Sequence, residues 1–441
     1  MYWKVEYVLL IIASTLVDYY AGLQIYQSRD HSRKKKFLLL SLCINLGLLF
    51  FFKYTDFILE NIHLLIGWPG VSDSPTQLNL ILPIGISFYT FQTLSYTIDI
   101  YRGELKPERH LGYFALYVSF FPQLIAGPIE KAKNLIPQLK RKIVFEYENA
   151  REGMILIAWG VFKKIVIADR IALVIEPIYA HPHDFHGVAI ALAAMLFMIQ
   201  VYCDFSGYSD IAIGTARIIG IRLSLNFKNS FFSKSIGELW SKWHITLMDW
   251  FKSYVYIPLG GSRGSRAFGY RNILIVFALS GLWHGADWNV VSFGLVNGAY
   301  IVLEKMTYSF RVRIANFIGL DKIPNIHKAM QIAITFLLFS ISGLFFRAES
   351  IYDTIVMIQN LWSANFLSLE QYSKTGIWHN IILIPSILLL FSTERLLGEE
   401  TLGQFLSQKK LLIRWLVYIL LIGICVNFGI TGEQEFVYFQ F

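Results

Sequence analysis

Apolar runs close to 20 residues long recur along nearly the whole of this 441-residue chain, and they limit its fold more than any other feature. A helix needs about 20 apolar residues to cross a bilayer, where every backbone polar group must find a partner within the protein. The composition agrees, because 55% of the residues are hydrophobic and 16% are charged, against about 25% charged in soluble domains. The sequence therefore predicts an all-α polytopic membrane protein.

We expect about ten or eleven membrane helices from the number of such runs. No long polar block remains for a soluble domain, so residues 1–441 are predicted to form a single membrane domain. Glu6 and the lack of a small-residue cleavage site favour a first span over a removed signal peptide. The candidate spans are residues 5–26, 37–59, 78–100, 152–178, 187–218, 271–284, 288–305, 329–346, 377–396 and 411–430.

The basic residues, which give a net charge of +8, gather in the loops between these spans. The positive-inside rule explains this pattern and argues against a nucleic-acid partner. It places 29–36 and 131–151 in the cytoplasm and 67–77, which has no Lys or Arg, outside. Residues 111–128 should then enter the membrane and return, and the mixed basic and aromatic stretch 217–271 should form re-entrant and interfacial helices.

Two short stretches offer other chemistry only weakly. "HPHDFH" (181–186) holds possible metal ligands, but their spacing matches no specific site, so we expect no metal. "GGSRGSR" (260–266) lacks the preceding strand and the Lys-Ser/Thr ending of a P-loop. Its arginines could meet an anionic cytoplasmic group or lipid headgroups. The three cysteines are far apart and indicate neither a disulfide framework nor a thiolate site.

"ALSGLWHGADWN" (278–289) places His284 beside a tryptophan within an apolar stretch. An uncompensated polar group in such surroundings costs several kcal/mol, so ionisable residues inside membranes are candidates for function. Burial lowers the pKa of an imidazole and keeps it neutral. His284 is therefore a candidate general base.

"ELWSKWHITLMDWFKSYVYIPLGG" (238–261) places Trp240, Trp243, His244 and Trp250 at helical spacing. Taken alone, this pattern is typical of an aromatic belt at headgroup depth. His244, however, shares the Trp-flanked setting of His284, and the pair together favours a site.

"QVYCDFSGYSDIAIG" (200–214) places Asp204 and Asp210 in an otherwise uncharged span, with Gly207 and Gly214 allowing close approach of a neighbouring helix. The carboxylates could form a proton or cation path. A structural role, capping a helix end or holding an arginine, is the more common reason for such residues.

These stretches together resemble the membrane-bound O-acyltransferase (MBOAT) family, in its bacterial alginate O-acetyltransferase-like branch. The resemblance also runs through "LPIGISFYTFQTLSYTIDIYRG" (82–103), "FFPQLIAGPIEK" (120–131), "FFRAES" (345–350) and the terminal "FVYFQF". It implies many helices, with re-entrant and interfacial ones, around a tunnel that crosses the membrane.

The resemblance also implies roles for individual residues. The family's two key histidines fall on His244 and His284, where an acyl thioester from the cytoplasm would meet an acceptor hydroxyl. His284 would be the base, and His244 would orient the thioester or assist proton transfer. "SKWH" has one basic residue where close relatives often show two. The expected substrate contacts are Trp240, Trp243 and Trp283 as walls, Lys242 and Arg263 for coenzyme A phosphates, and Asp204 and Tyr208.

The expected donor is acetyl-CoA, with no permanently bound cofactor and no metal. We expect a bacterial cytoplasmic (inner) membrane protein, surrounded by membrane lipids, that works with an extracytoplasmic SGNH-hydrolase-like partner. Residues 362–376 and the C-terminal "FVYFQF" should lie outside, where the latter could be a docking edge. Two alternatives remain: D-alanyl transfer from a carrier-protein thioester towards teichoic acids, and a proton-coupled transporter or lipid flippase.

Overall fold

The computed structural model describes residues 6–66, 78, 80–83, 85–363, 380–398, 400–430, 432 and 436–437. Within these residues the regular secondary structure is helical and no strand occurs, which confirms the predicted all-α class. The chain divides into two compact units, residues 1–146 with 219–224 and residues 147–218 with 225–441. The single domain expected from the sequence stays a prediction.

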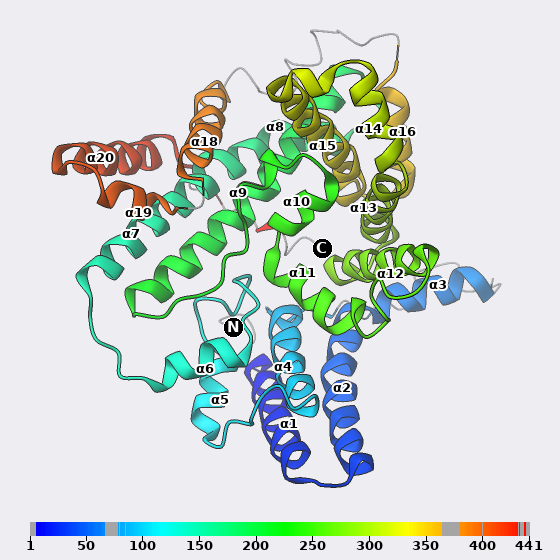
Figure 1. The fold of residues 1–441 in the computed structure, drawn as a ribbon, viewed down its shortest axis with the longest axis vertical. Coiled ribbons are helices and arrows are strands. Elements are labelled where there is room, and N and C mark those ends of the chain that lie inside the picture. The colour runs from blue at the N-terminus through cyan, green and yellow to red at the C-terminus, as the bar shows by residue number, and fades with distance from the viewer. Residues whose placement is uncertain are drawn as a thin grey trace. The chain divides into compact units, whose positions relative to one another are not determined.

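The first unit contains the N-terminal helices. They are α1 (Tyr7–Gln27), α2 (His31–Lys53), α3 (Thr55–Ile66), α4 (Ile86–Tyr101), α5 (Leu111–Val118) and α6 (Ala132–Lys140). Figure 1 shows α1, α2 and α4 side by side, and all three helices contact one another.

A buried polar network joins these three helices. The carboxylate of Asp18 on α1 accepts hydrogen bonds from Ser41 Oγ at 2.5 Å and from Asn45 Nδ2 at 2.9 Å, both on α2. Ser41 also contacts Thr97 on α4 at 3.1 Å. Helices surrounded by lipid gain little from burying apolar surface against each other, so such hydrogen bonds specify how they pair.

Helix α4 and the residue before it, Gly85, contact α5 and the irregular segment that follows α5. Gln92 on α4 donates to the carbonyl of Tyr117 at 2.7 Å, and the Tyr117 hydroxyl donates to the carbonyl of Glu130 at 3.0 Å. Gly85, at φ 79°, is needed at the start of α4, because a Cβ there would lie 2.4 Å from the carbonyl oxygen of Leu124. The predicted re-entry of 111–128 stays a prediction.

The second unit contains the remaining helices. They are α7 (Tyr147–Val161), η1 (Phe162–Ala168), α8 (Asp169–Ala180), α9 (Val188–Ile218), η2 (Ser230–Phe232), α10 (Ile236–Lys242), α11 (Ile245–Phe251), η3 (Lys252–Tyr256), α12 (Arg266–His284), α13 (Trp288–Met306), α14 (Tyr308–Phe317), η4 (Leu320–Lys322), α15 (Pro324–Arg347), α16 (Ile351–Asn360), α18 (Leu383–Leu397), α19 (Leu402–Ser407) and α20 (Leu411–Phe428).

Glycines bring α7 and α9 into backbone contact. A Cβ on Gly160 would lie 2.4 Å from the carbonyl oxygen of Gly207, and a Cβ on Gly153 would lie 2.6 Å from that of Gly214. Small residues at matching positions are a common way for membrane helices to pack closely. The close approach predicted at Gly207 and Gly214 is therefore confirmed.

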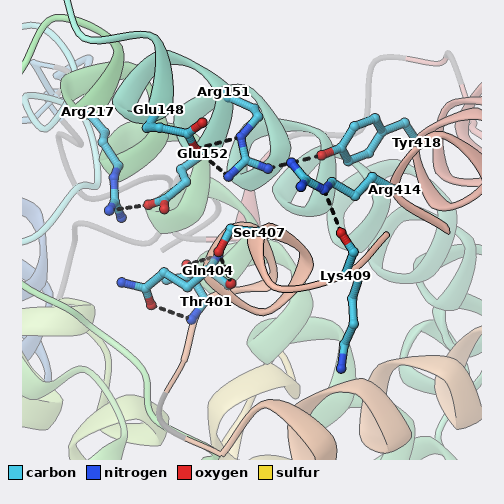
Figure 2. Close-up of polar contacts among 10 residues, drawn as sticks. All are labelled: Glu148, Arg151, Glu152, Arg217, Thr401, Gln404, Ser407, Lys409, Arg414 and Tyr418. Carbon is cyan, nitrogen blue, oxygen red and sulfur yellow. Dashed lines mark hydrogen bonds and ion pairs between the residues drawn. The ribbon is translucent and has the colours of Figure 1, made fainter. Parts of the chain in front are cut away.

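Charged residues join the first turns of α7 to neighbouring helices, as Figure 2 shows. Arg151 donates to the Glu148 carboxylate at 2.6 Å and reaches the hydroxyl of Tyr418 on α20 at 3.4 Å. Glu152 forms an ion pair with Arg217 at the end of α9. Arg151 and Arg217 therefore have polar partners inside the protein.

Five described helices are long and apolar enough to cross a membrane: α1, α2, α9, α15 and α20. The boundaries differ from those expected from hydropathy. The predicted span 37–59 is divided at Tyr54 between α2 and α3, and α2 already begins at His31, where Asp30 accepts hydrogen bonds from the first-turn amides. Hydropathy locates the apolar part of a helix, but capping decides where the helix starts.

Several predictions fall on residues that the structure leaves undescribed. The external loop 67–77 lies outside the described residues. The same is true of most of 362–376, of the start of the predicted span 377–396, and of residues 438–441.

Candidate active site

His244 lies in a strained backbone conformation between two short helices of the second unit. It is the residue before α11 and has φ 45° and ψ 51°. Asn229 and His244 are the described residues other than glycine with positive φ. For an L-residue this conformation costs on the order of 1–2 kcal/mol, and such strain is often found at functional sites.

Asn226 holds the backbone and side chains next to His244. Its carbonyl accepts from the Ile245 amide at 2.9 Å, and its side-chain oxygen accepts from the Thr246 hydroxyl at 2.6 Å. The His244 side chain is fully buried. These hydrogen bonds fix Ile245 and Thr246, which follow His244, and so fix the position of the imidazole.

His284 is the last residue of α12, and close packing of α12 against α13 sets its position. A Cβ on Gly281 would lie 2.4 Å from the carbonyl oxygen of Val290, and one on Gly294 would lie 2.1 Å from that of Phe277. The two helices therefore touch through their backbones one turn before His284. Its side chain is 6% exposed.

The structure brings the two histidines together. Their ring centroids are 6.4 Å apart. Trp283 contacts both, with centroid distances of 6.0 Å to His244 and 4.9 Å to His284, and Phe205 lies 4.6 Å from His244. A small group between the two imidazoles would be within reach of both, which is the geometry that proton transfer requires.

A small aromatic cavity adjoins His284. Trp240 and Trp243 line it together with residues of α9, α13 and α15, among them Phe293 and Phe346. Its volume is about 10 Å³, which is close to the space that one water molecule needs. An acyl group entering from this side requires that the lining rings move.

The electrostatic setting favours a neutral imidazole at His244. This residue lies outside the candidate membrane spans. Burial lowers its pKa well below the ordinary histidine value, and the nearby His284 lowers it further. A neutral ring can accept a proton at one nitrogen and donate at the other.

The two residues predicted to meet coenzyme A phosphates lie elsewhere. Lys242, at the end of α10, forms an ion pair of 2.7 Å with Glu238. Arg263 is exposed in the turn that follows Gly260 and Gly261, whose φ values of 97° and 60° favour glycine. Neither lines the cavity at His284, and their phosphate role stays a prediction.

Asp204 and Tyr208, predicted as substrate contacts, both meet the C-terminal segment. The Asp204 carboxylate accepts from the Val437 amide at 2.7 Å and pairs with Lys164 at 2.6 Å. The Tyr208 ring lies 5.4 Å from that of Phe436. Phe436 and Val437 are buried, so this described part of the suggested docking edge packs within its own unit.

Asp210 also has a cation partner. Lys163 pairs with it at 2.5 Å and donates to Ser206 at 2.9 Å. Both carboxylates of this span therefore hold lysines rather than the expected arginine. Lys163 and Lys164 reach these carboxylates because both lie on η1, which contacts α9.

Four residues next to the histidines were missed by sequence reasoning: Asn226, Phe205, Phe293 and Phe346. Phe205 and Phe346 lie within the family-like stretches "QVYCDFSGYSDIAIG" and "FFRAES", which were the available signal. The others belong to stretches whose local pattern indicates only a core position. In the described part of the chain, no three His, Cys, Asp or Glu residues are placed to hold a metal ion.

Comparisons with known proteins show the family of the chain. Residues 109–348, which include both histidines, match the model of the membrane-bound O-acyltransferase family. The chain is 34% identical over 399 residues to a peptidoglycan O-acetyltransferase of Helicobacter pylori, covering 85% of this chain and 73% of the relative.

Two further proteins are similar to this chain. A probable alginate O-acetylase AlgI of Pseudomonas putida is 31% identical over 460 residues, covering 100% of this chain and 92% of the relative. A teichoic acid D-alanyltransferase of Bacillus subtilis is 28% identical over 251 residues, covering 53% of this chain and 62% of the relative. The protein is thus a multi-pass membrane protein, and the chain belongs to the membrane-bound O-acyltransferase family, whose members are acyltransferases.

Proposed function

We propose that this protein transfers an acetyl group from cytoplasmic acetyl-CoA to a hydroxyl, as the membrane step in O-acetylation of a cell-surface polysaccharide or of peptidoglycan. The observation that carries the proposal is the pair of buried imidazoles, His244 and His284, 6.4 Å apart. The similarity to a peptidoglycan O-acetyltransferase and to a probable alginate O-acetylase supports the acyl group and the class of acceptor.

In the proposed reaction His284 accepts the proton of the acceptor hydroxyl while the oxygen attacks the thioester carbonyl carbon. The carbon–sulfur bond then breaks, and the proton passes to the departing thiolate, which leaves an O-acetyl ester and free coenzyme A. His244, kept neutral by burial, donates from its ring N–H to the carbonyl oxygen. Because thioesters are already reactive, orientation and one base supply much of the rate.

The same proposal covers the membrane, the side from which coenzyme A enters, and the partner protein. The protein lies in the bacterial inner membrane, with coenzyme A entering from the cytoplasm. An extracytoplasmic SGNH-hydrolase-like partner receives the acetyl group, and no metal or permanently bound cofactor takes part. The chain's membrane helices and its similarity to enzymes that act on cell-surface polymers support this arrangement.

Substituting each histidine tests the assignment. His284→Gln should lower acetyl transfer from radiolabelled acetyl-CoA by about 10²–10⁴-fold, the usual contribution of a positioned base. His183→Gln is the matched control, because that histidine is exposed in the loop after α8. Unchanged activity in His284→Gln, at equal amounts of folded protein, would refute the proposed base.

D-alanyl transfer is the second candidate, and the teichoic acid D-alanyltransferases among the relatives favour it. Purified protein should be supplied separately with labelled acetyl-CoA and with a D-alanyl carrier protein. We expect acetyl uptake. Ready D-alanyl transfer without acetyl transfer would reverse the order of the two candidates and leave the role of His284 intact.

A further inference from the structure

A second, much larger cavity lies in the same unit, against α13, α14 and α15. Its volume is about 510 Å³, within the range of about 300–1,000 Å³ that is usual for small-molecule sites. We call it the α14 cavity, after the helix that contributes Arg311, Val312 and Ala315 to its wall. It shares no lining residue with the cavity at His284.

Basic side chains reach this cavity from three separate segments. Lys234 precedes α10, Arg311 lies on α14, and His327 lies in the first turn of α15. None of the three forms an ion pair with a described carboxylate. The acidic lining residue is Glu304, whose carboxylate accepts from the Gly237 amide at 3.1 Å and whose backbone carbonyl accepts from Arg311 at 2.9 Å. Two cationic side chains, Lys234 and Arg311, against one carboxylate leave the polar side of the cavity with an excess of positive charge.

The other side of the cavity is apolar and elongated. Along α15 it extends from His327 to Leu338, which is about 16 Å at the rise of an α-helix. Ile334 from α15 and Leu303 from α13 add to this wall. Because α15 is one of the candidate membrane spans, this wall runs along a helix that crosses hydrocarbon. An extended hydrocarbon chain matches its length and chemistry.

Helix α14 indicates at what depth the charged side lies. It carries Arg311 and Arg313 together with strongly exposed apolar residues, among them Phe310 and Phe317, which are 65% and 91% exposed. A helix that mixes arginines with exposed aromatic rings is typical of the membrane interface. Figure 1 shows α14 beside α13 and α15; α14 contacts α13, and η4, which follows α14, contacts α15. The positive side chains would therefore lie among lipid headgroups.

We propose that the α14 cavity binds one anionic phospholipid. Its phosphate lies near Lys234 and Arg311, and one acyl chain extends along α15 towards Leu338. Basic pockets between membrane helices are known to select anionic headgroups. The proposal rests on different residues from the acetyl-transfer site, so either can fail without the other.

The test is lipid retention by the full-length protein, measured by native mass spectrometry. The protein is purified in detergent and supplied with phosphatidylglycerol or with phosphatidylcholine of the same acyl chains. We expect retention of one phosphatidylglycerol in preference to phosphatidylcholine. Equal retention of the two lipids, or equal retention of a free fatty acid, overturns the proposal.

Substitutions on α14 test whether the lipid binds in the α14 cavity. Arg311→Gln should weaken phosphatidylglycerol binding about fivefold, the effect expected for one basic residue near anionic lipid. Arg313→Gln is the matched control, since it lies on the same helix but does not line the cavity. Ala315→Phe, which fills the cavity from α14, should abolish retention. Equal losses for Arg311→Gln and Arg313→Gln overturn the proposal even if Ala315→Phe fails to fold.

Discussion

The contact between α12 and α13 allows a quantitative prediction about catalysis. In Gly281→Ala the new methyl carbon would lie 2.4 Å from the carbonyl oxygen of Val290, whereas ordinary contacts begin at 3.4 Å. The helices must therefore separate by about 1 Å, and His284, three residues further along α12, moves with them. A misplacement of about 1 Å in a catalytic group can lower the rate about 10²-fold.

The assay compares acetyl transfer and stability in the same preparations. Gly281→Ala should lose activity by about two orders of magnitude, while overpacking lowers the free energy of unfolding by about 1–3 kcal/mol. The amount of folded protein is measured by size-exclusion chromatography, and rates are expressed per folded molecule. The predicted loss is thus separated from loss of protein.

Gly423→Ala is the control for this experiment. Gly423 lies within α20, and a Cβ there would meet nothing within 4 Å. Its replacement should leave the rate unchanged and stabilise the helix by up to about 1 kcal/mol. If Gly281→Ala kept the wild-type rate, or if both variants lost activity equally, backbone contact at Gly281 would not be what positions His284.

Three further predictions concern stability. Asn45→Leu removes the amide that donates to the buried carboxylate on α1 and should lower the free energy of unfolding by about 1–2 kcal/mol; an unchanged midpoint in a mixed-micelle unfolding titration would contradict this. Lys163→Met leaves Asp210 without its ion-pair partner and should cost about 3–5 kcal/mol in the same titration, whereas a proton-relay role predicts lost transport with little loss of stability. Burial works to raise the pKa of Glu108, but the hydrogen bond and charge of Lys140 outweigh it and lower that pKa. Because a lowered carboxyl pKa stabilises the folded state above the unfolded value, the wild type should lose stability as pH falls below about 4. Glu108→Gln should flatten that acid dependence in thermal unfolding scans, and an identical pH profile would count against it.

Much of the helix pattern could be predicted because it depends on local features. Long apolar runs indicated α9, α15 and α20, and Gly207 and Gly214 indicated that another helix approaches α9 closely. The division at Tyr54 was not predicted, since the run 37–59 is apolar on both sides of it. Hydropathy alone does not distinguish a continuous helix from two helices separated by a break.

The site was predicted only in part. His244 and His284 could be chosen because a buried imidazole in a Trp-flanked apolar stretch is costly, and the family resemblance pointed to the same pair. Asn226 carries no such signal, because its role depends on which distant residues it meets. The functions predicted for Lys242 and Arg263 depend on a bound donor and stay predictions.

By itself, the sequence determined that this chain forms membrane helices and that two histidines lie in apolar surroundings, because both follow from the free energy of transferring local groups out of water. Only the tertiary structure decided that the two imidazole ring centroids lie 6.4 Å apart, that Asp204 and Asp210 pair with Lys164 and Lys163, and that a positively charged cavity forms against α14. These features depend on helix packing between segments 40 or more residues apart in the case of the histidines and the aspartates. Backbone contacts such as that between Gly160 and Gly207 fix packing at that separation, and no local pattern encodes which distant segment each glycine meets.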